Sequence, residues 1–251
     1  MKFYILFLGS ILSAITFLSS FPVNHITQQE SFSLKDSLEK YTNAESKLIV
    51  FDSDSSYATL FIGKVEKHSY AVWMDNDTIF TLFQKPNSSE WVATDTINIG
   101  GPFSFAKAED LNGDNYADLK ISSLNGMADN TENRVFMFDT STKTFKLNDF
   151  YSLTNIKYNK DGKFIQSSWF SGAVHCQDKK KYDVKGNSLT FNMGITFCPN
   201  EDDGGKTGTL ELYKLVSGKR VTVKSESGES GKLWSEFDSI FWNSENDMGG
   251  E

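Results

Sequence analysis

Short runs of β-forming residues recur along most of this chain, and they constrain its fold more than any other feature. From Leu48 onward, runs of strand length follow one another about every ten residues, with polar turn residues between them. The chain also contains 21 Phe, 9 Tyr and 5 Trp, side chains that fit a pleated, half-buried surface. Because no long helical pattern separates the runs, we expect an all-β, mainly antiparallel fold. A sandwich, a barrel and a propeller-like assembly all satisfy this periodicity.

Several neighbouring runs are joined by short turns typical of β-hairpins. Residues 139–143 separate the runs 134–138 and 144–147. A second turn carries Asp161-Gly162, a dipeptide favoured in tight hairpin connections. These turns predict strands that pair with their neighbours in sequence.

The first twenty residues have the pattern of a secretory signal. Lys2 precedes an apolar run from Ile5 to Leu18, and two small residues, Ser19 and Ser20, follow it. An uncleaved membrane anchor is the alternative, although the run is short for a bilayer. Neither cysteine of the chain lies next to the run, so attachment of a lipid to a cysteine there is excluded. The pattern predicts a periplasmic or secreted protein that meets a membrane only if the signal stays uncleaved.

The remaining sequence divides into three parts. Residues 21–46 are polar and Ser-rich and are expected to form a flexible leading segment, in which Ser33 can cap a short helix. Residues 47–242 contain the strand-like runs and are predicted to form a single β domain around one calcium loop. Residues 243–251 are polar and contain glycine, so a disordered tail is expected there.

The charge balance limits the kinds of partner. The chain has 33 acidic and 25 basic residues, a formal net charge of −8. An acidic surface repels phosphate backbones, so nucleic acid is not an expected partner. A basic protein partner is compatible with this charge, and so is a surface that serves solubility alone.

Cys176 and Cys198 are the only cysteines, and their placement favours a disulfide. The segment between them has a turn at Gly186-Asn187, and folding it about Asn187 puts position 176 opposite position 198. In an oxidising compartment such a pair is expected to be bonded. Two buried free thiols or a metal-binding pair are the alternatives.

Residues 110–118 have the composition of a calcium-binding loop. Side-chain oxygens stand at alternate positions, with a flexible glycine between them and a further carboxylate at the end. Calcium accepts six to eight oxygen ligands in an adaptable geometry. The expected ligands are Asp110, Asn112, Asp114, the main-chain carbonyl of Tyr116, and Asp118.

Two observations define this loop further. An EF-hand would need Glu at its twelfth position, where this chain has Ile121, and a strand-like run rather than a helix follows. A metal-free Asn-Gly turn is the alternative, but three carboxylates so close together would repel one another without a cation. Leu111 and Leu119 are expected to anchor the loop to the core, which gives calcium a structural role.

This loop resembles the Asp-x-Asn-Gly-Asp-x-x-x-Asp-Leu core of FG-GAP and VCBS-type repeats, which form calcium-bearing β-propeller blades. The chain contains one full copy. Over roughly residues 105–195, its later motifs are similar to a group of exported proteins with a single calcium loop. That group includes a calcium-binding glycoside-hydrolase inhibitor, an immunity protein against a secreted peptidoglycan-cleaving effector. The motifs behind this resemblance lie at residues 134–138, 142–145, 153–155, 163–167, 171–173 and 182–189.

The resemblance also points to a contact loop. In periplasmic lysozyme inhibitors a Ser-Gly-x-x-Tyr loop enters the cleft of the enzyme. Here Ser171-Gly172 matches that motif, whereas His175 stands where Tyr is expected. Trp169, Ser171, Gly172 and His175 are therefore the candidate partner-binding residues, since aromatic residues often anchor interfaces. An ordinary turn is the alternative for Ser171-Gly172.

The chain carries no recognisable catalytic motif. Its three histidines are isolated from one another, and no nucleophile motif accompanies them. Residues 201–203 are acidic but flanked by turn formers, as in a solvated loop. We therefore expect a binding protein rather than an enzyme. Three functions stay open: inhibition of a lysozyme-like cell-wall hydrolase, recognition of a glycan or surface protein, and an envelope role in which calcium is purely structural.

Overall fold

The computed structural model describes most of the predicted β domain and the end of the segment that precedes it. The described residues are 33–53, 56–75, 79–85, 90–98, 103–125, 130–172 and 175–240. The predicted signal at residues 1–20 and the predicted tail at 243–251 lie outside these ranges. In the described part of the chain, no helix is both long and apolar enough to cross a bilayer.

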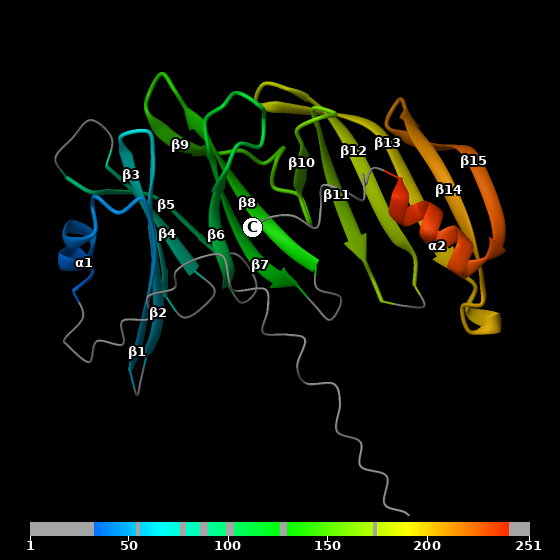
Figure 1. Ribbon diagram of the computed structural model, residues 1–251, viewed down its shortest axis with the longest axis horizontal. Helices are drawn as coiled ribbons and strands as arrows, with labels where there is room; N and C mark the ends of the chain where they lie inside the picture. The colour runs from blue at the N-terminus through cyan, green and yellow to red at the C-terminus, as the bar shows by residue number, and fades with distance from the viewer. Residues whose placement is uncertain are drawn as a thin grey trace, which may run out of the picture.

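The described strands form three antiparallel sheets, each a meander of consecutive strands (Figure 1). The all-β, mainly antiparallel prediction is therefore confirmed, and the strand order of these sheets closes none of them into a barrel. The five-stranded sheet contains β1 (Ser46–Ser53), β2 (Ser56–Val65), β3 (His68–Asp75), β4 (Ile79–Lys85) and β5 (Val92–Asn98). The four-stranded sheet contains β6 (Phe103–Glu109), β7 (Asp118–Asn125), β8 (Asn130–Asp139) and β9 (Thr144–Leu147). The six-stranded sheet contains β10 (Lys157–Asn159), β11 (Phe164–Phe170), β12 (Gln177–Lys185), β13 (Ser188–Pro199), β14 (Thr207–Val216) and β15 (Lys219–Glu229).

The four-stranded sheet lies between the other two. Alternate residues of its strands point to opposite faces, and each face packs against one of the neighbouring sheets. On β8, Phe136 and Phe138 belong to a core shared with the five-stranded sheet. Their neighbours Val135 and Met137 belong to a core shared with the six-stranded sheet. All four side chains are buried. The three sheets therefore stack in sequence order, as sandwich layers or neighbouring propeller blades do.

Ring contacts and one amide fix the first of these two interfaces. Phe80 and Phe136 meet edge to face with ring centroids 6.0 Å apart, and Tyr70 meets Phe145 at 5.0 Å. Gln84, also buried, donates from Nε2 to the Phe145 carbonyl at 3.0 Å and accepts from the Phe145 amide at 2.6 Å. Because this side chain satisfies both backbone groups of Phe145, it continues the hydrogen bonding across the interface.

In the described ranges, two short helices flank the sheets. Helix α1 (Leu34–Lys40) begins after Ser33, whose side chain accepts from the Asp36 amide, and it is the short helix considered for this segment. Helix α2 (Ser230–Ser239) was not expected from the sequence. A 3-10 turn spans Glu201–Asp203.

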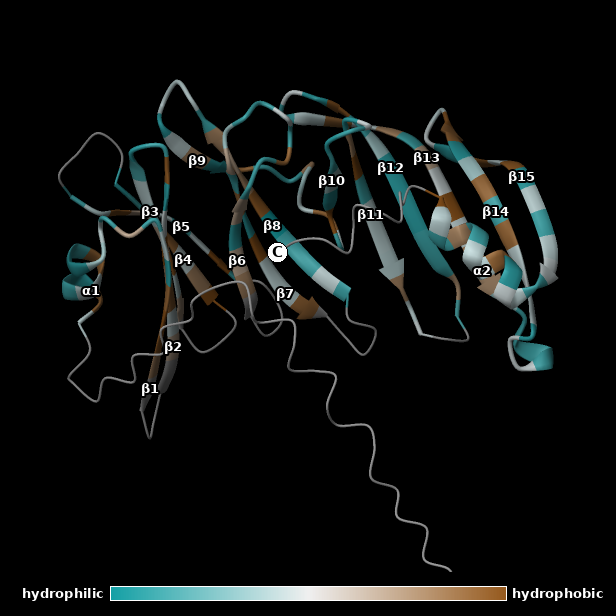
Figure 2. Cartoon of the chain, in the orientation of Figure 1, coloured by the Kyte–Doolittle hydropathy of each residue, from teal (hydrophilic) through white to brown (hydrophobic). Residues whose placement is uncertain are grey.

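Helix α2 covers one face of the six-stranded sheet. Leu233 and Phe237 are one helical turn apart and both are buried against Ile195, Phe197 and Leu210. Hydrophobic and hydrophilic residues alternate along β14 (Figure 2), and its Leu210 and Leu212 belong to the core under this helix.

A buried lysine on β12 fastens the same helix to the sheet. Lys179 is 2% exposed and donates from Nζ to the Phe237 carbonyl at 3.1 Å. The same ammonium group pairs with Asp238 at 3.1 Å and lies 4.4 Å from the centre of the Phe237 ring. A buried ammonium group needs such partners, so Lys179 fixes the position of α2.

Candidate calcium loop and contact loop

Backbone amides hold the first carboxylate of the predicted calcium loop, which joins β6 to β7. Asp110 accepts hydrogen bonds from the amides of Asn112 at 3.3 Å, Gly113 at 2.7 Å and Asn115 at 3.0 Å. Gly113 and Asn115 have φ angles of 77° and 70°, in the left-handed region that Gly and Asn tolerate best. The residue types at these positions therefore suit the tight path of the loop.

The next two predicted ligands interact with each other and with the backbone ahead of them. Asn112 Oδ1 accepts from the Asp114 amide at 3.0 Å, and Asp114 Oδ1 accepts from the Tyr116 amide at 2.9 Å. Asn112 Nδ2 donates to Asp114 Oδ2 at 2.9 Å. Each side chain thus closes a local turn and keeps its oxygen atoms within the loop.

Asp118 has a different position from the other acids. Its carboxylate is fully buried and accepts from the Leu111 amide at 3.0 Å and the Phe138 amide at 2.9 Å. Burial raises the pKa of Asp118 to about 7, with a smaller contribution from Asp114 and Asp110, while the two amide donors lower it. Asp118 therefore ties the base of the loop to β8.

The loop residues fit calcium by the chemistry of their donors. All the predicted ligands offer oxygen, and each ionised carboxylate can accept about four hydrogen bonds or metal contacts, more than the structure gives it. In the described residues, however, no three His, Cys, Asp or Glu side chains gather into a group that could hold a metal ion. The predicted ligand set contains three acids, Asp110, Asp114 and Asp118, together with an amide oxygen and a main-chain carbonyl. The loop is therefore suited to a hard cation, and calcium binding stays a prediction.

The anchors of the loop reach two different cores. Leu111 is 1% exposed and packs with Val135, Tyr151 and Ile165 between the four- and six-stranded sheets. Leu119 is also buried, in the core on the other side of the four-stranded sheet. Through these two leucines, the loop region contributes to the packing between the four-stranded sheet and each of its neighbours.

The turn between β12 and β13 rests against the loop, a contact that the sequence pattern did not indicate. Asn112 Nδ2 donates to Asn187 Oδ1 at 3.0 Å. Asn148 Nδ2 donates to the Asn187 carbonyl at 2.8 Å, and the Tyr151 hydroxyl donates to the Gly186 carbonyl at 2.8 Å. These bonds join residues far apart in sequence, and they place the six-stranded sheet against the loop.

The predicted contact loop begins at the end of β11, and its Ser-Gly pair is held by internal bonds. The Ser171 hydroxyl donates to the Cys176 carbonyl at 2.6 Å. Gln177 Nε2 donates to the carbonyls of Gly172 and His175, and Gly172 has a φ angle of 108°. Positions 173 and 174 lie outside the described residues. Ser171 and Gly172 therefore shape the loop by bonding within it.

The two aromatic ends of this loop face solvent. Trp169 is 43% exposed, and the His175 side chain is 59% exposed, with Nδ1 3.4 Å from Glu201 Oε1. The predicted disulfide between Cys176 and Cys198 is present and joins the end of the loop to β13. Structural disulfides persist in oxidising compartments, which indicates an extracytoplasmic protein.

Comparisons with known proteins give no family. No family model and no curated protein matches the chain. One similar solved structure is described as that of a Xanthomonas Type IV Secretion System related protein. It has 15% sequence identity and a TM-score of 0.44, over 72% of this chain and 95% of that one. Similarity of this extent carries no functional assignment.

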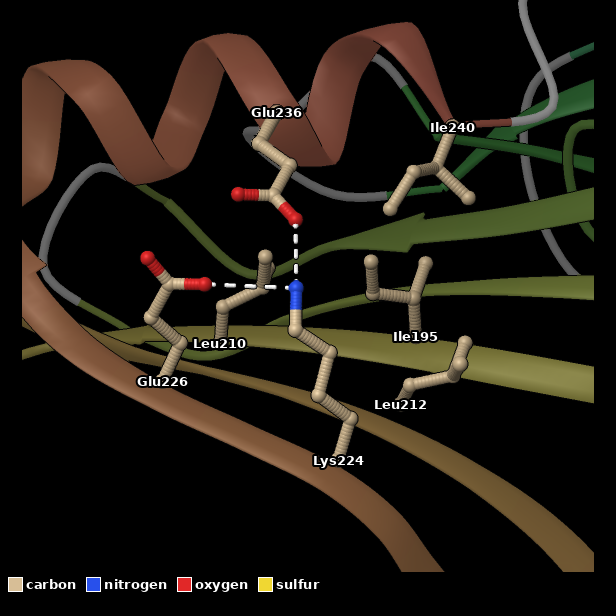
Figure 3. Close-up of a pocket in the computed structure, with 7 residues that line it drawn as sticks. All are labelled: Ile195, Leu210, Leu212, Lys224, Glu226, Glu236 and Ile240. Carbon is tan, nitrogen blue, oxygen red and sulfur yellow. Dashed lines mark hydrogen bonds and ion pairs between the residues drawn. The ribbon is translucent and has the colours of Figure 1, made fainter.

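A small cavity beneath α2 has a structural explanation. Lys224 Nζ pairs there with Glu236 Oε1 at 3.0 Å and Glu226 Oε2 at 3.2 Å (Figure 3). Both carboxylates raise the pKa of Lys224. The cavity measures about 110 Å³, and its other lining residues are Ile195, Leu210, Leu212 and Ile240. Lys224 and Glu226 lie on β15, whereas Glu236 lies on α2. These ion pairs therefore connect the helix to the strand.

Proposed function

We propose that this protein is an exported binding protein that inhibits a lysozyme-like cell-wall hydrolase through the loop at residues 169–175. The observation that carries the proposal is the exposure of Trp169 and His175 at the two ends of a loop fixed by a disulfide and by Gln177. Loop ends that are already held in place lose less conformational entropy on binding. Exposed aromatic side chains on such a loop are suited to anchor a protein partner.

The hydrogen bonds within the loop support different roles for its residues. The Ser171 hydroxyl bonds to the Cys176 carbonyl, so its donor is already engaged before a partner arrives. In the proposed complex, Trp169 and His175 make the contacts, while Ser171 and Gly172 hold the loop in shape. His175 takes the place that the tyrosine occupies in the lysozyme-inhibitor motif.

Calcium has a supporting role in this proposal. The ion binds in loop 110–118 through oxygen donors of Asp110, Asn112, Asp114, the main-chain carbonyl of Tyr116 and Asp118, and it offsets the repulsion between the carboxylates. The loop contacts Asn187 and packs Leu111 between two sheets. Calcium therefore stabilises the scaffold and makes no contact with the partner. The signal predicted at residues 1–20 would export the chain to the periplasm or beyond.

A mixing assay tests this function. The purified protein is added to lysozyme-like hydrolases of several classes acting on bacterial cell walls. We expect it to inhibit at least one class and to degrade no cell wall by itself. Trp169→Ala and His175→Ala should each raise the inhibition constant by about tenfold or more, as loss of an interface anchor does.

A matched control comes from an aromatic residue elsewhere. Phe150 is 64% exposed and lies outside the contact loop, so Phe150→Ala should inhibit like the unaltered protein. Inhibition of no hydrolase class would contradict the proposal. Inhibition that survives both loop substitutions would show that the contact lies elsewhere.

A further inference from the structure

A second cavity opens on the face of the six-stranded sheet opposite α2. It measures about 200 Å³ and is lined by Thr154, Ser167, Ser168, Trp169, Asp178 and Lys180. The pairing of β11 with β12 sets Trp169 opposite Asp178 and Ser167 opposite Lys180. Lys179, between them in sequence, points to the other face and bonds to α2. The alternation of side chains along a strand therefore gathers Trp169, Asp178 and Lys180 on one side.

The polar groups of this cavity are fixed before any ligand binds. The Asp178 carboxylate accepts from the Thr196 hydroxyl at 2.9 Å and from the Tyr213 hydroxyl at 3.0 Å. Lys180 Nζ lies 3.2 Å from the same carboxylate. Four polar groups therefore hold one another in place, an arrangement that reduces the entropy lost on binding.

Two ion pairs lie on this face. Lys180 pairs with Asp178, and farther along the sheet Arg220 pairs with Glu211 at 2.7 Å. A paired cation and anion offer hydrogen-bond donors and acceptors without a net charge. Such a surface favours a neutral ligand rich in hydroxyl groups over an ionic one.

We propose that this cavity is a subsite for one ring of a neutral carbohydrate. The partly exposed indole of Trp169 offers an apolar surface for the C–H face of a sugar ring. Lys180, Asp178 and the neighbouring hydroxyl groups offer partners for its O–H groups. The cavity is smaller than the roughly 300–1,000 Å³ typical of sites for larger ligands, which fits a single ring. This site goes beyond the proposed inhibition and depends on Lys180, which the inhibitory contact does not use.

Saturation-transfer NMR with two neutral probes, tri-N-acetylchitotriose and maltotriose, tests the subsite. We expect transfer to at least one of them. Trp169→Ala and Lys180→Met should each weaken its binding by about tenfold or more. Phe150→Ala, a change outside both sites, should bind it unchanged. Acetate, a small anion, should compete poorly, because Asp178 already pairs with Lys180.

Several results would overturn the subsite. These are transfer to neither probe, equal binding by the Trp169→Ala and Lys180→Met variants, and displacement of the sugar by acetate at equal concentration. Thermal unfolding of each variant separates loss of the site from loss of the fold. Inhibition of a hydrolase without sugar binding would overturn the subsite and leave the proposed function standing. Sugar binding without inhibition of any hydrolase would overturn the proposed function and leave the subsite standing.

Discussion

Replacing Leu111 with alanine is expected to lower the free energy of unfolding by about 3 kcal/mol, within the range of 2–5 kcal/mol seen for buried leucines. Leu111 is 1% exposed and packs with Val135, Met137 and Tyr151 between two sheets. The substitution removes these contacts and leaves a cavity that the stacked sheets cannot easily close. Urea denaturation, followed by circular dichroism, measures the change.

Leu124 provides the control for this experiment. It is 44% exposed at the end of β7, so Leu124→Ala should change the free energy of unfolding by no more than about 0.5 kcal/mol. Equal effects of the two substitutions would contradict the role of Leu111 as the anchor of the loop.

Loss of the disulfide is expected to have an effect of similar size. Cys176 and Cys198 are 22 positions apart, and closing a loop of this length stabilises a protein by about 3 kcal/mol in the chain-entropy model. The double substitution Cys176→Ser with Cys198→Ser should therefore lower the midpoint of urea denaturation. It should also weaken inhibition of the hydrolase, because Cys176 directly follows the contact loop.

A reducing agent gives the matched comparison. It should destabilise the unaltered protein to the level of the double-serine variant and leave that variant unchanged. Unaltered stability of the double-serine variant would show that the disulfide does not contribute to the fold. A lower stability with full inhibition would show that the contact loop does not depend on it.

The features that the sequence predicted well are local in the chain. The hairpin expected around Asp161-Gly162 forms between β10 and β11, and the Gly162 amide donates to Asn159 Oδ1 at 2.8 Å. The pairing of β12 with β13 about Asn187 brings Cys176 and Cys198 together, as the turn indicated. Turn chemistry and alternation act over a few residues, so they are readable without the tertiary structure.

The features that the sequence did not predict depend on distant residues. Helix α2 is short, and Lys179 holds it by a hydrogen bond to the Phe237 carbonyl, 58 positions later in the chain. The contact of Asn112 with Asn187 joins positions 75 apart. The cavity beside Trp169 needs the register of β11 with β12 and the orientation that Tyr213 gives to Asp178. No local pattern encodes these pairings.

The position of loop 110–118 explains why calcium should matter to the whole fold. Leu111 in the loop and Leu119 directly after it reach the cores on the two faces of the four-stranded sheet, and Asn112 bonds to the turn at Asn187. A cation that fixes this loop therefore fixes the stacking of all three sheets. Its effect should appear in global unfolding rather than in the loop alone.

Calcium titration of the metal-free protein tests this claim most directly, with calorimetry for binding and thermal unfolding for stability. We predict one bound calcium per chain and a stabilisation of about 2.7 kcal/mol when free calcium is about 100 times Kd. Asp114→Ala should abolish both effects and, in the presence of a chelator, unfold like the unaltered protein, because Asp114 is exposed. The absence of binding heat, together with identical unfolding in calcium and in chelator, would contradict the account.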